Sequence, residues 1–346
     1  MATFDPAAAT ATYLSKLSPE ANDRAVAYTQ GGHWVLLWTA VISLAIYLLL
    51  VRSGVLVRLR DRLEARGFGP LRVSALVLGT AFVVETLLNL PWSVYADWAR
   101  ERSYGLSSQS FAGWLGESAL ASVIGLPVSL ALIVGIYALI RRAPKTWWLW
   151  SAALIAAGSV VMMVVAPVFI APLFNQYEPA PPGPVRDAVV VLAKANGVPS
   201  DRIFIYNGSR QSNRYTANVA GLFGSTRIAM SDVMFAKGAD LAEVRAVVGH
   251  EMGHYVLRHG WRNAIVISIL AVLALFTVDR LFVPAARWLG AGGVRGLADP
   301  AGYPVIVAIV VGLGLISTPV TASPIRVSEA VTGVLIRPRP TTMATI

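Results

Sequence analysis

Long apolar stretches are the feature that most constrains what this chain can fold into. A helix needs about 20 mostly apolar residues to cross a bilayer, and about six stretches of that length occur here. The mean hydropathy of +0.60 also exceeds that of an ordinary soluble domain. We therefore predict a polytopic α-helical membrane protein. The predicted spans are residues 34–51, 73–94, 118–140, 147–171, 263–284 and 303–323.

A polar region at 172–262 separates the fourth predicted span from the fifth. Charged side chains recur along it, so it is expected to face water and not lipid. Its apolar periodicity and turn residues predict a small α+β domain. We therefore divide the chain into a membrane region, 1–171, and a second domain, 172–346, that includes the last two spans. The expected elements are a Pro-rich boundary at 179–184, a helix at 185–195, and strands at 202–206 and 226–230 around a loop at 207–216.

A metal-binding pattern, His250-Glu251-Met252-Gly253-His254, lies near the end of the polar region. Asp240 as N-cap and Glu243 in a capping box predict a helix that runs to about His259. Histidines four residues apart share one helix face and can both reach a Zn²⁺ ion. Glu251 is offset by about 100° and is placed to act as a general base toward water. A chance match on a surface helix is the competing interpretation.

Catalytic zinc usually has three protein ligands, and the chain contains no cysteine, so a carboxylate or a third histidine is required. Three carboxylates follow His254. Asp279 lies within an apolar span, and Asp299 precedes Pro300 in a loop that suits a turn. Glu329 is the best candidate if the last two spans form a hairpin. His259, about 140° from His254 on a continuous helix, would point off the metal face, as a neighbour of the ligands or as an interfacial residue.

Several segments resemble the type I CAAX prenyl endopeptidases, which are integral-membrane zinc proteases of the gluzincin type. The resemblance covers most of the chain. It rests on the metal-binding pattern and on the segments 90–93, 101–105, 167–175, 221–224, 227–228 and 325–329.

This resemblance implies zinc on His250, His254 and Glu329, with Glu251 as the base. It implies hydrolysis that removes C-terminal residues from prenylated CAAX-type proteins or from other membrane-delivered peptides. By the same resemblance, residues 216–223 form an edge strand to which an extended peptide adds through main-chain hydrogen bonds. The substrate-binding residues implied there are Thr216, Ala217, Asn218 and Gly221.

The segment after Glu329 departs from the family. Members usually continue with an acidic pair and then supply a histidine for the oxyanion and an arginine for the substrate carboxylate. Here Ala330-Val331-Thr332-Gly333 follows, and no histidine occurs in the tail. We therefore expect a truncated C-terminus and impaired catalysis. The alternatives are a zinc-binding membrane scaffold, a general quality-control protease, or a transporter in which the motif is incidental.

The net charge of +10 comes largely from short loops beside apolar stretches, a topology signal that does not indicate nucleic-acid binding. The expected partners are membrane lipids and a peptide or protein substrate, which the prediction allows to be prenylated. Six Arg in 52–72 and three basic residues in 141–146 would place those loops in the cytoplasm. Family topology implies the opposite. We expect the catalytic side to be cytoplasmic, in the cell membrane or, in a bacterium, the inner membrane.

Overall fold

The computed structural model describes residues 5, 12, 15, 17–221 and 226–317. The chain divides into two compact units, one formed by Met1–Trp38 with Leu313–Ile346 and a larger one formed by Thr39–Gly312. The contacts, cavities and candidate sites below lie in the larger unit. The functional division into 1–171 and 172–346 stays a prediction.

The predicted membrane spans are confirmed, because the described residues contain 6 helices that are long and apolar enough to cross a bilayer. Each predicted stretch falls on one of them, although residues 318–323 of the last stretch lie outside the described residues. The structure extends most of the helices beyond the apolar stretch. The fold class is therefore a polytopic helical membrane protein with a small mixed sheet. The spans are α2 (Pro19–Ser53), α4 (Pro70–Ser93) with η1 (Val94–Ala99) and α5 (Arg100–Ser103), α6 (Phe111–Arg142), α7 (Trp147–Val165) with η2 (Ala166–Ile170) and α8 (Ala171–Phe174), α11 (His259–Leu289), and Pro300–Ser317, which starts with η5 (Pro300–Gly302).

A short helix that the hydropathy pattern did not predict, α3 (Val55–Ala65), follows α2 directly. The chain turns between them at Gly54, whose φ of 61° is one that glycine adopts without steric cost. Leu56 and Leu63 lie on the buried face of α3, while most of its arginines stay in water. The helix is thus amphipathic and too short and charged to be read as a span.

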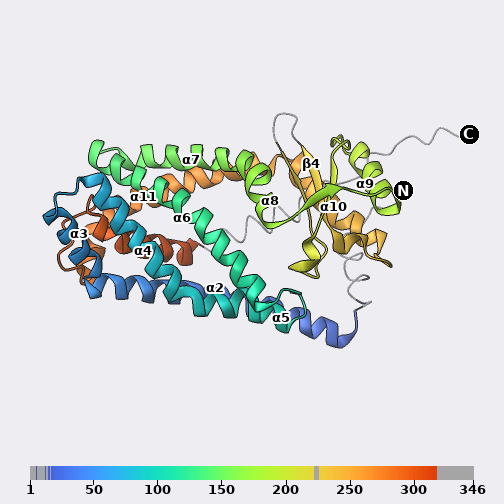
Figure 1. Cartoon of the computed structure of the whole chain (residues 1–346), viewed down its shortest axis with the longest axis horizontal. Helices are drawn as coiled ribbons and strands as arrows, with labels where there is room; N and C mark the ends of the chain where they lie inside the picture. The colour runs from blue at the N-terminus through green and yellow to red at the C-terminus, as the bar shows by residue number, and fades with distance from the viewer. Residues whose placement is uncertain (1–4, 6–11, 13–14, 16, 222–225, 318–346) are drawn as a thin grey trace, which may run out of the picture. The chain divides into compact units, whose positions relative to one another are not determined.

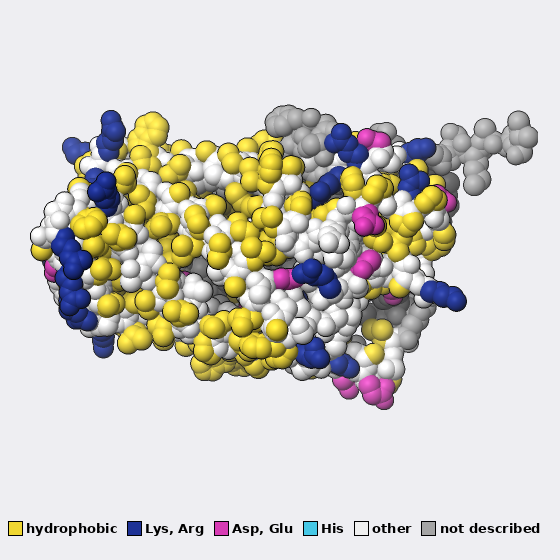
Figure 2. All heavy atoms as spheres, viewed as in Figure 1, with side chains coloured by type: hydrophobic (Ala, Val, Ile, Leu, Met, Phe, Trp, Pro, Cys, Tyr) yellow, Lys and Arg dark blue, Asp and Glu magenta, His cyan; other side chains and the backbone are white. Residues whose placement is uncertain are grey.

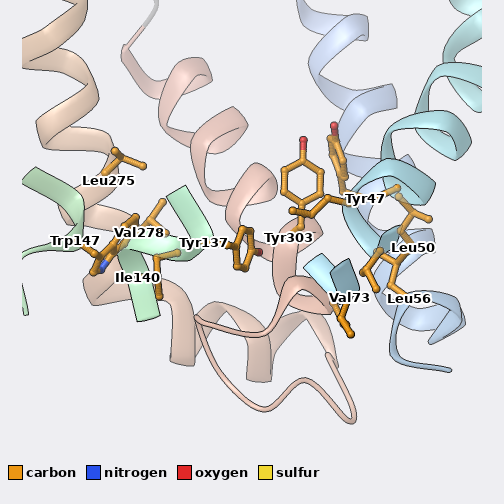
Figure 3. Packing of buried hydrophobic residues seen from close by; sticks show 14 of the residues in the cluster. Tyr47, Leu50, Leu56, Val73, Tyr137, Ile140, Trp147, Leu275, Val278 and Tyr303 are labelled. Carbon is orange, nitrogen blue, oxygen red and sulfur yellow. The ribbon is translucent and has the colours of Figure 1, made fainter. Parts of the chain in front are cut away.

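The membrane helices pack through aromatic and branched side chains (Figure 3). Tyr47 and Tyr303 meet edge to face with their ring centroids 6.2 Å apart. The indole N–H of Trp147 donates to Oδ1 of Asp279 at 2.7 Å. The Asp279 carboxylate, which lies inside the span α11, therefore has a hydrogen-bond partner. Many outward-facing Leu, Val and Ile side chains of these helices are exposed, as expected of a surface that meets lipid (Figure 2).

The polar region forms a four-stranded sheet in the order β1-β2-β4-β3. Strands β2 and β4 run parallel, and the other two pairs are antiparallel. Its core joins the sheet to α9 and α10 through Val189, Ile228, Met230, Val244 and Val248. The predicted helix and two strands are confirmed, and β1 and β3 were not assigned individually from the pattern. The bounds are β1 (Tyr177–Pro179), α9 (Pro184–Ala195), β2 (Ile203–Tyr206), η3 (Gly208–Arg210), β3 (Ala217–Ala220), β4 (Arg227–Ser231), η4 (Asp232–Phe235) and α10 (Leu241–Val256).

The loop between β2 and β3 is bound to the connection between α5 and α6. Ser107 and Ser212 form an isolated β-bridge. Arg214 pairs with Glu101 at 2.7 Å, and Arg210 pairs with Glu117 near the start of α6. These bonds hold the sheet beside the end of the helix bundle at which α4 finishes and α6 begins (Figure 1).

Candidate functional site

Helix α10 carries the metal-binding pattern on its outward face. It begins as predicted, because the Asp240 side chain accepts a hydrogen bond from the backbone N–H of Ala242 at 2.7 Å. Val244, Val248 and Met252 face the core of the sheet domain. The helical period then turns the two motif histidines toward solvent.

The two motif histidines point their ring nitrogens at one another. Nε2 of His250 lies 3.0 Å from Nε2 of His254. One ligand atom from each histidine and one from Glu251 all lie within 4.8 Å of one another, with Glu251 half-buried and both histidines exposed. Two imidazole nitrogens that share a tetrahedral zinc are about 3.3 Å apart, so this pair fits the ion after a small adjustment. Glu329 lies outside the described residues, and its role as third ligand stays a prediction.

The helix end corrects one sequence-based expectation. We expected the helix to continue to about His259, but α10 ends at Val256. Arg258 adopts a left-handed conformation with φ of 54°, and α11 starts at His259. The assumption of a 140° offset on a continuous helix was therefore wrong. Instead, Nδ1 of His259 lies 2.6 Å from Nδ1 of His254.

This contact fits the tautomer that a ligand role for His254 would need. A histidine that binds metal through Nε2 has its remaining proton on Nδ1, so His254 would donate to His259. His259 would then accept at Nδ1 and carry its own proton on Nε2. That Nε2 atom is buried and has no hydrogen-bond partner among the described residues. The sequence left open whether His259 is a neighbour of the metal ligands or an interfacial residue. Its contact with His254 favours the first of these.

A cavity of about 640 Å³ opens beside His254. The end of β3 forms one wall through Val219, Ala220 and Gly221. Met163 of α7 and Trp261 of α11 contribute apolar side chains from two membrane spans. Sequence reasoning missed both of the latter, because neither lies in a motif and the fold alone brings them to the motif helix.

The four residues implied as substrate-binding are placed differently from one another. Gly221 lines the cavity and has a φ of 131°, a conformation that favours glycine. Thr216 is exposed and Asn218 half-buried, whereas the Ala217 side chain is buried in the core. Ala217 could therefore meet a peptide only through its main chain. Strand β3 does form an edge of the described sheet, with β4 on its one paired side.

Two family models match consecutive parts of the chain. Residues 7–176 match one described as CAAX prenyl protease N-terminal, five membrane helices. Residues 179–323 match peptidase family M48. Four of the candidate spans fall in the first segment, and the motif helix falls in the second.

Curated relatives agree with these matches. A protein called uncharacterized metalloprotease YhfN, from Bacillus subtilis, is 27% identical over 291 residues, which cover 82% of this chain and 66% of that protein. A CAAX prenyl protease 1 homolog from Arabidopsis thaliana is 31% identical over 187 residues, covering 54% of this chain and 44% of the relative. The chain thus spans about half to two thirds of the length of these relatives.

The fold also has a solved counterpart. The crystal structure of S. mikatae Ste24p superposes with a TM-score of 0.65 at 22% identity, covering 86% of this chain and 72% of that one. The two family models together leave few residues of the chain unmatched, and they place the chain in a known group. The chain belongs to peptidase family M48, the family of the CAAX prenyl proteases.

Proposed function

We propose that this chain is a zinc-dependent membrane metalloendopeptidase, and that it removes C-terminal residues from prenylated CAAX-type proteins or peptides. The observation that carries the proposal is the convergence of His250 Nε2, His254 Nε2 and a Glu251 carboxylate oxygen on the exposed face of one helix. Membership of a peptidase family supports the same function.

Each motif side chain has a role that follows from its position. His250 and His254 would hold the ion, with Glu329 as the proposed third ligand. Zinc, when bound, supplies a Lewis acid that polarises a carbonyl and makes water more acidic. Glu251 lies next to His250 but is offset around the helix, so its carboxylate can take a proton from water and deliver it to the departing amine.

The edge of the sheet suggests how a peptide is aligned. An extended segment that pairs with the free edge of β3 would run along the wall of the cavity toward His254. Thr216, Asn218 and Gly221 would contribute through this edge, and Ala217 through its main chain. Met163 and Trp261 supply an apolar wall that favours a hydrophobic group on the substrate, such as a prenyl chain.

Zinc content and cleavage, measured on the purified full chain, test the proposal. We expect about one zinc per chain and cleavage of a quenched farnesylated peptide. Glu251→Gln should retain zinc and lose cleavage, while His250→Ala and Glu329→Ala should lose both. Glu243→Gln is the matched control, since this carboxylate lies in the first turn of the same helix, away from the motif.

The outcomes separate the competing functions. Zinc without cleavage of any peptide would favour a zinc-binding scaffold. Equal cleavage of farnesylated and unmodified peptides would favour a general quality-control protease over a prenyl-specific one. A purified chain that binds no zinc would overturn the peptidase proposal.

A further inference from the structure

A second cavity lies at the other end of the helix bundle from the metal-binding motif. Its volume is about 310 Å³, and Arg60, Arg141 and Arg295 line it. Apolar side chains from Phe68, Pro70 and Val73 form part of the same wall. A cavity with three guanidinium groups and an apolar side has the composition expected for an amphipathic anion.

The position of this cavity matches a membrane interface. Span α4 begins at Pro70, and span α6 ends at Arg142. The cavity-lining residues Ser74 and Arg141 therefore lie in or near the terminal turns of two spans, at the depth where lipid headgroups are found. Phe68 and Leu71 beside it are exposed, which continues the apolar surface outward from the cavity.

The surface around the cavity is strongly basic. Segments 52–72, 141–146 and 287–299 together hold eleven Lys and Arg against three Asp and Glu, which accounts for most of the net charge of +10. They lie at one end of the bundle, where Arg52 donates to the Leu289 carbonyl and Arg60 donates to the Gly293 carbonyl. Figure 2 shows basic side chains gathered along this end.

The carboxylates of the cavity are already paired. Asp299 is bound by Arg60, and Glu64 accepts hydrogen bonds from Arg295. The hydrogen bonds that Arg295 donates to Glu64 raise the pKa of Arg295, so this side chain stays cationic. Because both carboxylates are paired with arginines, the cavity holds little uncompensated negative charge that would repel an anion.

Arg141 is the lining cation without such a neutralising partner. Its Nη1 atom donates to Oγ of the buried Ser74 at 3.1 Å. Among the described residues, no carboxylate forms an ion pair with it. Ser74 thus orients a half-buried guanidinium whose charge is not compensated in place, and guanidinium geometry matches a phosphate better than an ammonium does.

We propose that this cavity binds the phosphate of an anionic phospholipid, with Arg141 as the principal contact and Phe68 against the first part of the lipid chain. Phosphate chemistry alone would also suit a free phosphate ion. The apolar wall and the location at the ends of two spans favour the lipid.

Lipid binding to the purified, delipidated full chain tests this proposal. Native mass spectrometry would compare added phosphatidylglycerol with phosphatidylcholine, and inorganic phosphate would be the competitor. We expect phosphatidylglycerol to bind saturably and phosphatidylcholine not to compete. Arg141→Gln should weaken phosphatidylglycerol binding roughly five- to tenfold. Arg142→Gln, which removes the neighbouring exposed charge outside the cavity lining, should change it less than about twofold.

Three results would overturn the proposal. Equal weakening in the two variants would mean a diffuse surface attraction without a defined site. Binding of phosphatidylcholine as tight as that of phosphatidylglycerol would show that the net charge of the headgroup does not determine binding. Complete competition by millimolar inorganic phosphate would identify a free anion as the ligand. Arg141→Lys is the control for misfolding of Arg141→Gln. It keeps the positive charge and should lose only part of the affinity for phosphatidylglycerol.

Discussion

Nδ1 of His254 lies 2.6 Å from Nδ1 of His259, across a break between two helices. We infer from this contact that His259 positions His254, which is a proposed metal ligand. Such neighbours fix the tautomer and the ring orientation of a ligating histidine. We therefore expect His259→Ala to lower zinc affinity about 10- to 100-fold, as measured by competition with a coloured chelator.

Two variants control this prediction. His259→Gln retains an acceptor near Nδ1 of His254 and should recover part of the affinity. His33→Ala removes the chain's remaining histidine, which is exposed in α2, and should leave affinity unchanged. Unchanged zinc affinity in His259→Ala would show that the contact does not orient the ligand.

The helix break itself depends on an unusual conformation at Arg258. Its φ of 54° costs a residue with a Cβ about 1–2 kcal/mol, and a β-branched side chain more. Arg258→Val should therefore lower the thermal unfolding temperature and weaken zinc binding, because His259 would be drawn away from His254. Arg258→Gly adopts this conformation freely and should do neither. Equal zinc affinity in both variants would show that the break does not place His259.

The spans and the motif helix could be predicted from local patterns. Lipid demands about 20 apolar residues in a row, and a spacing of four places His250 and His254 on one face regardless of the rest of the fold. The N-cap at Asp240 also acts locally, through the N–H of Ala242. These features depend on residues that are neighbours along the chain.

Other features could not be predicted in this way. The break before His259 occurs at an arginine, and no glycine or proline marks it. The cavity beside His254 brings together Met163, Gly221 and Trp261, which are far apart in sequence. Helix α3 was not predicted because its five charged residues interrupt the apolar stretch. The break and the cavity depend on backbone conformation and on tertiary packing, and not on a periodic pattern.

A buried ion pair between Arg60 and Asp299 closes the basic end of the bundle. Both side chains are less than 5% exposed. Asp299→Asn leaves the buried Arg60 with only the half-exposed Asp61 as an ionic partner, and Arg60→Met leaves the buried Asp299 carboxylate with backbone N–H donors alone. Each variant should therefore lower the free energy of unfolding, by up to about 3–5 kcal/mol. Titration with a denaturing detergent would measure it. The double variant Arg60→Met with Asp299→Leu should recover much of the loss.

Asp61 provides the comparison for that pair. Its carboxylate also binds Arg60, but it is about half exposed, so Asp61→Asn should change stability little. The hydrogen bond from Arg60 lowers the pKa of Asp61, so any contribution it makes is present above its ordinary pKa and lost only as the pH falls through the lowered one. A loss in Asp61→Asn as large as in Asp299→Asn would contradict the role assigned to burial.

The orientation in the membrane can be decided because the chain contains no cysteine. Lys145 and Lys194 are both exposed, and the single span Trp147–Phe174 separates them, so they lie on opposite sides of the membrane. We propose that the catalytic side is cytoplasmic. Lys145→Cys should then react with an impermeant maleimide in intact cells, and Lys194→Cys should react only after permeabilisation.

The reverse labelling would follow from the positive-inside rule, which places the basic loops at 52–72 and 141–146 in the cytoplasm. It would put the metal-binding motif on the outer face, because α10 lies in the same sheet domain as Lys194. Substrates would then have to be exported peptides, and prenylated proteins that stay in the cytoplasm would be excluded. The labelling pattern of two lysine positions therefore decides which class of substrate can reach Glu251.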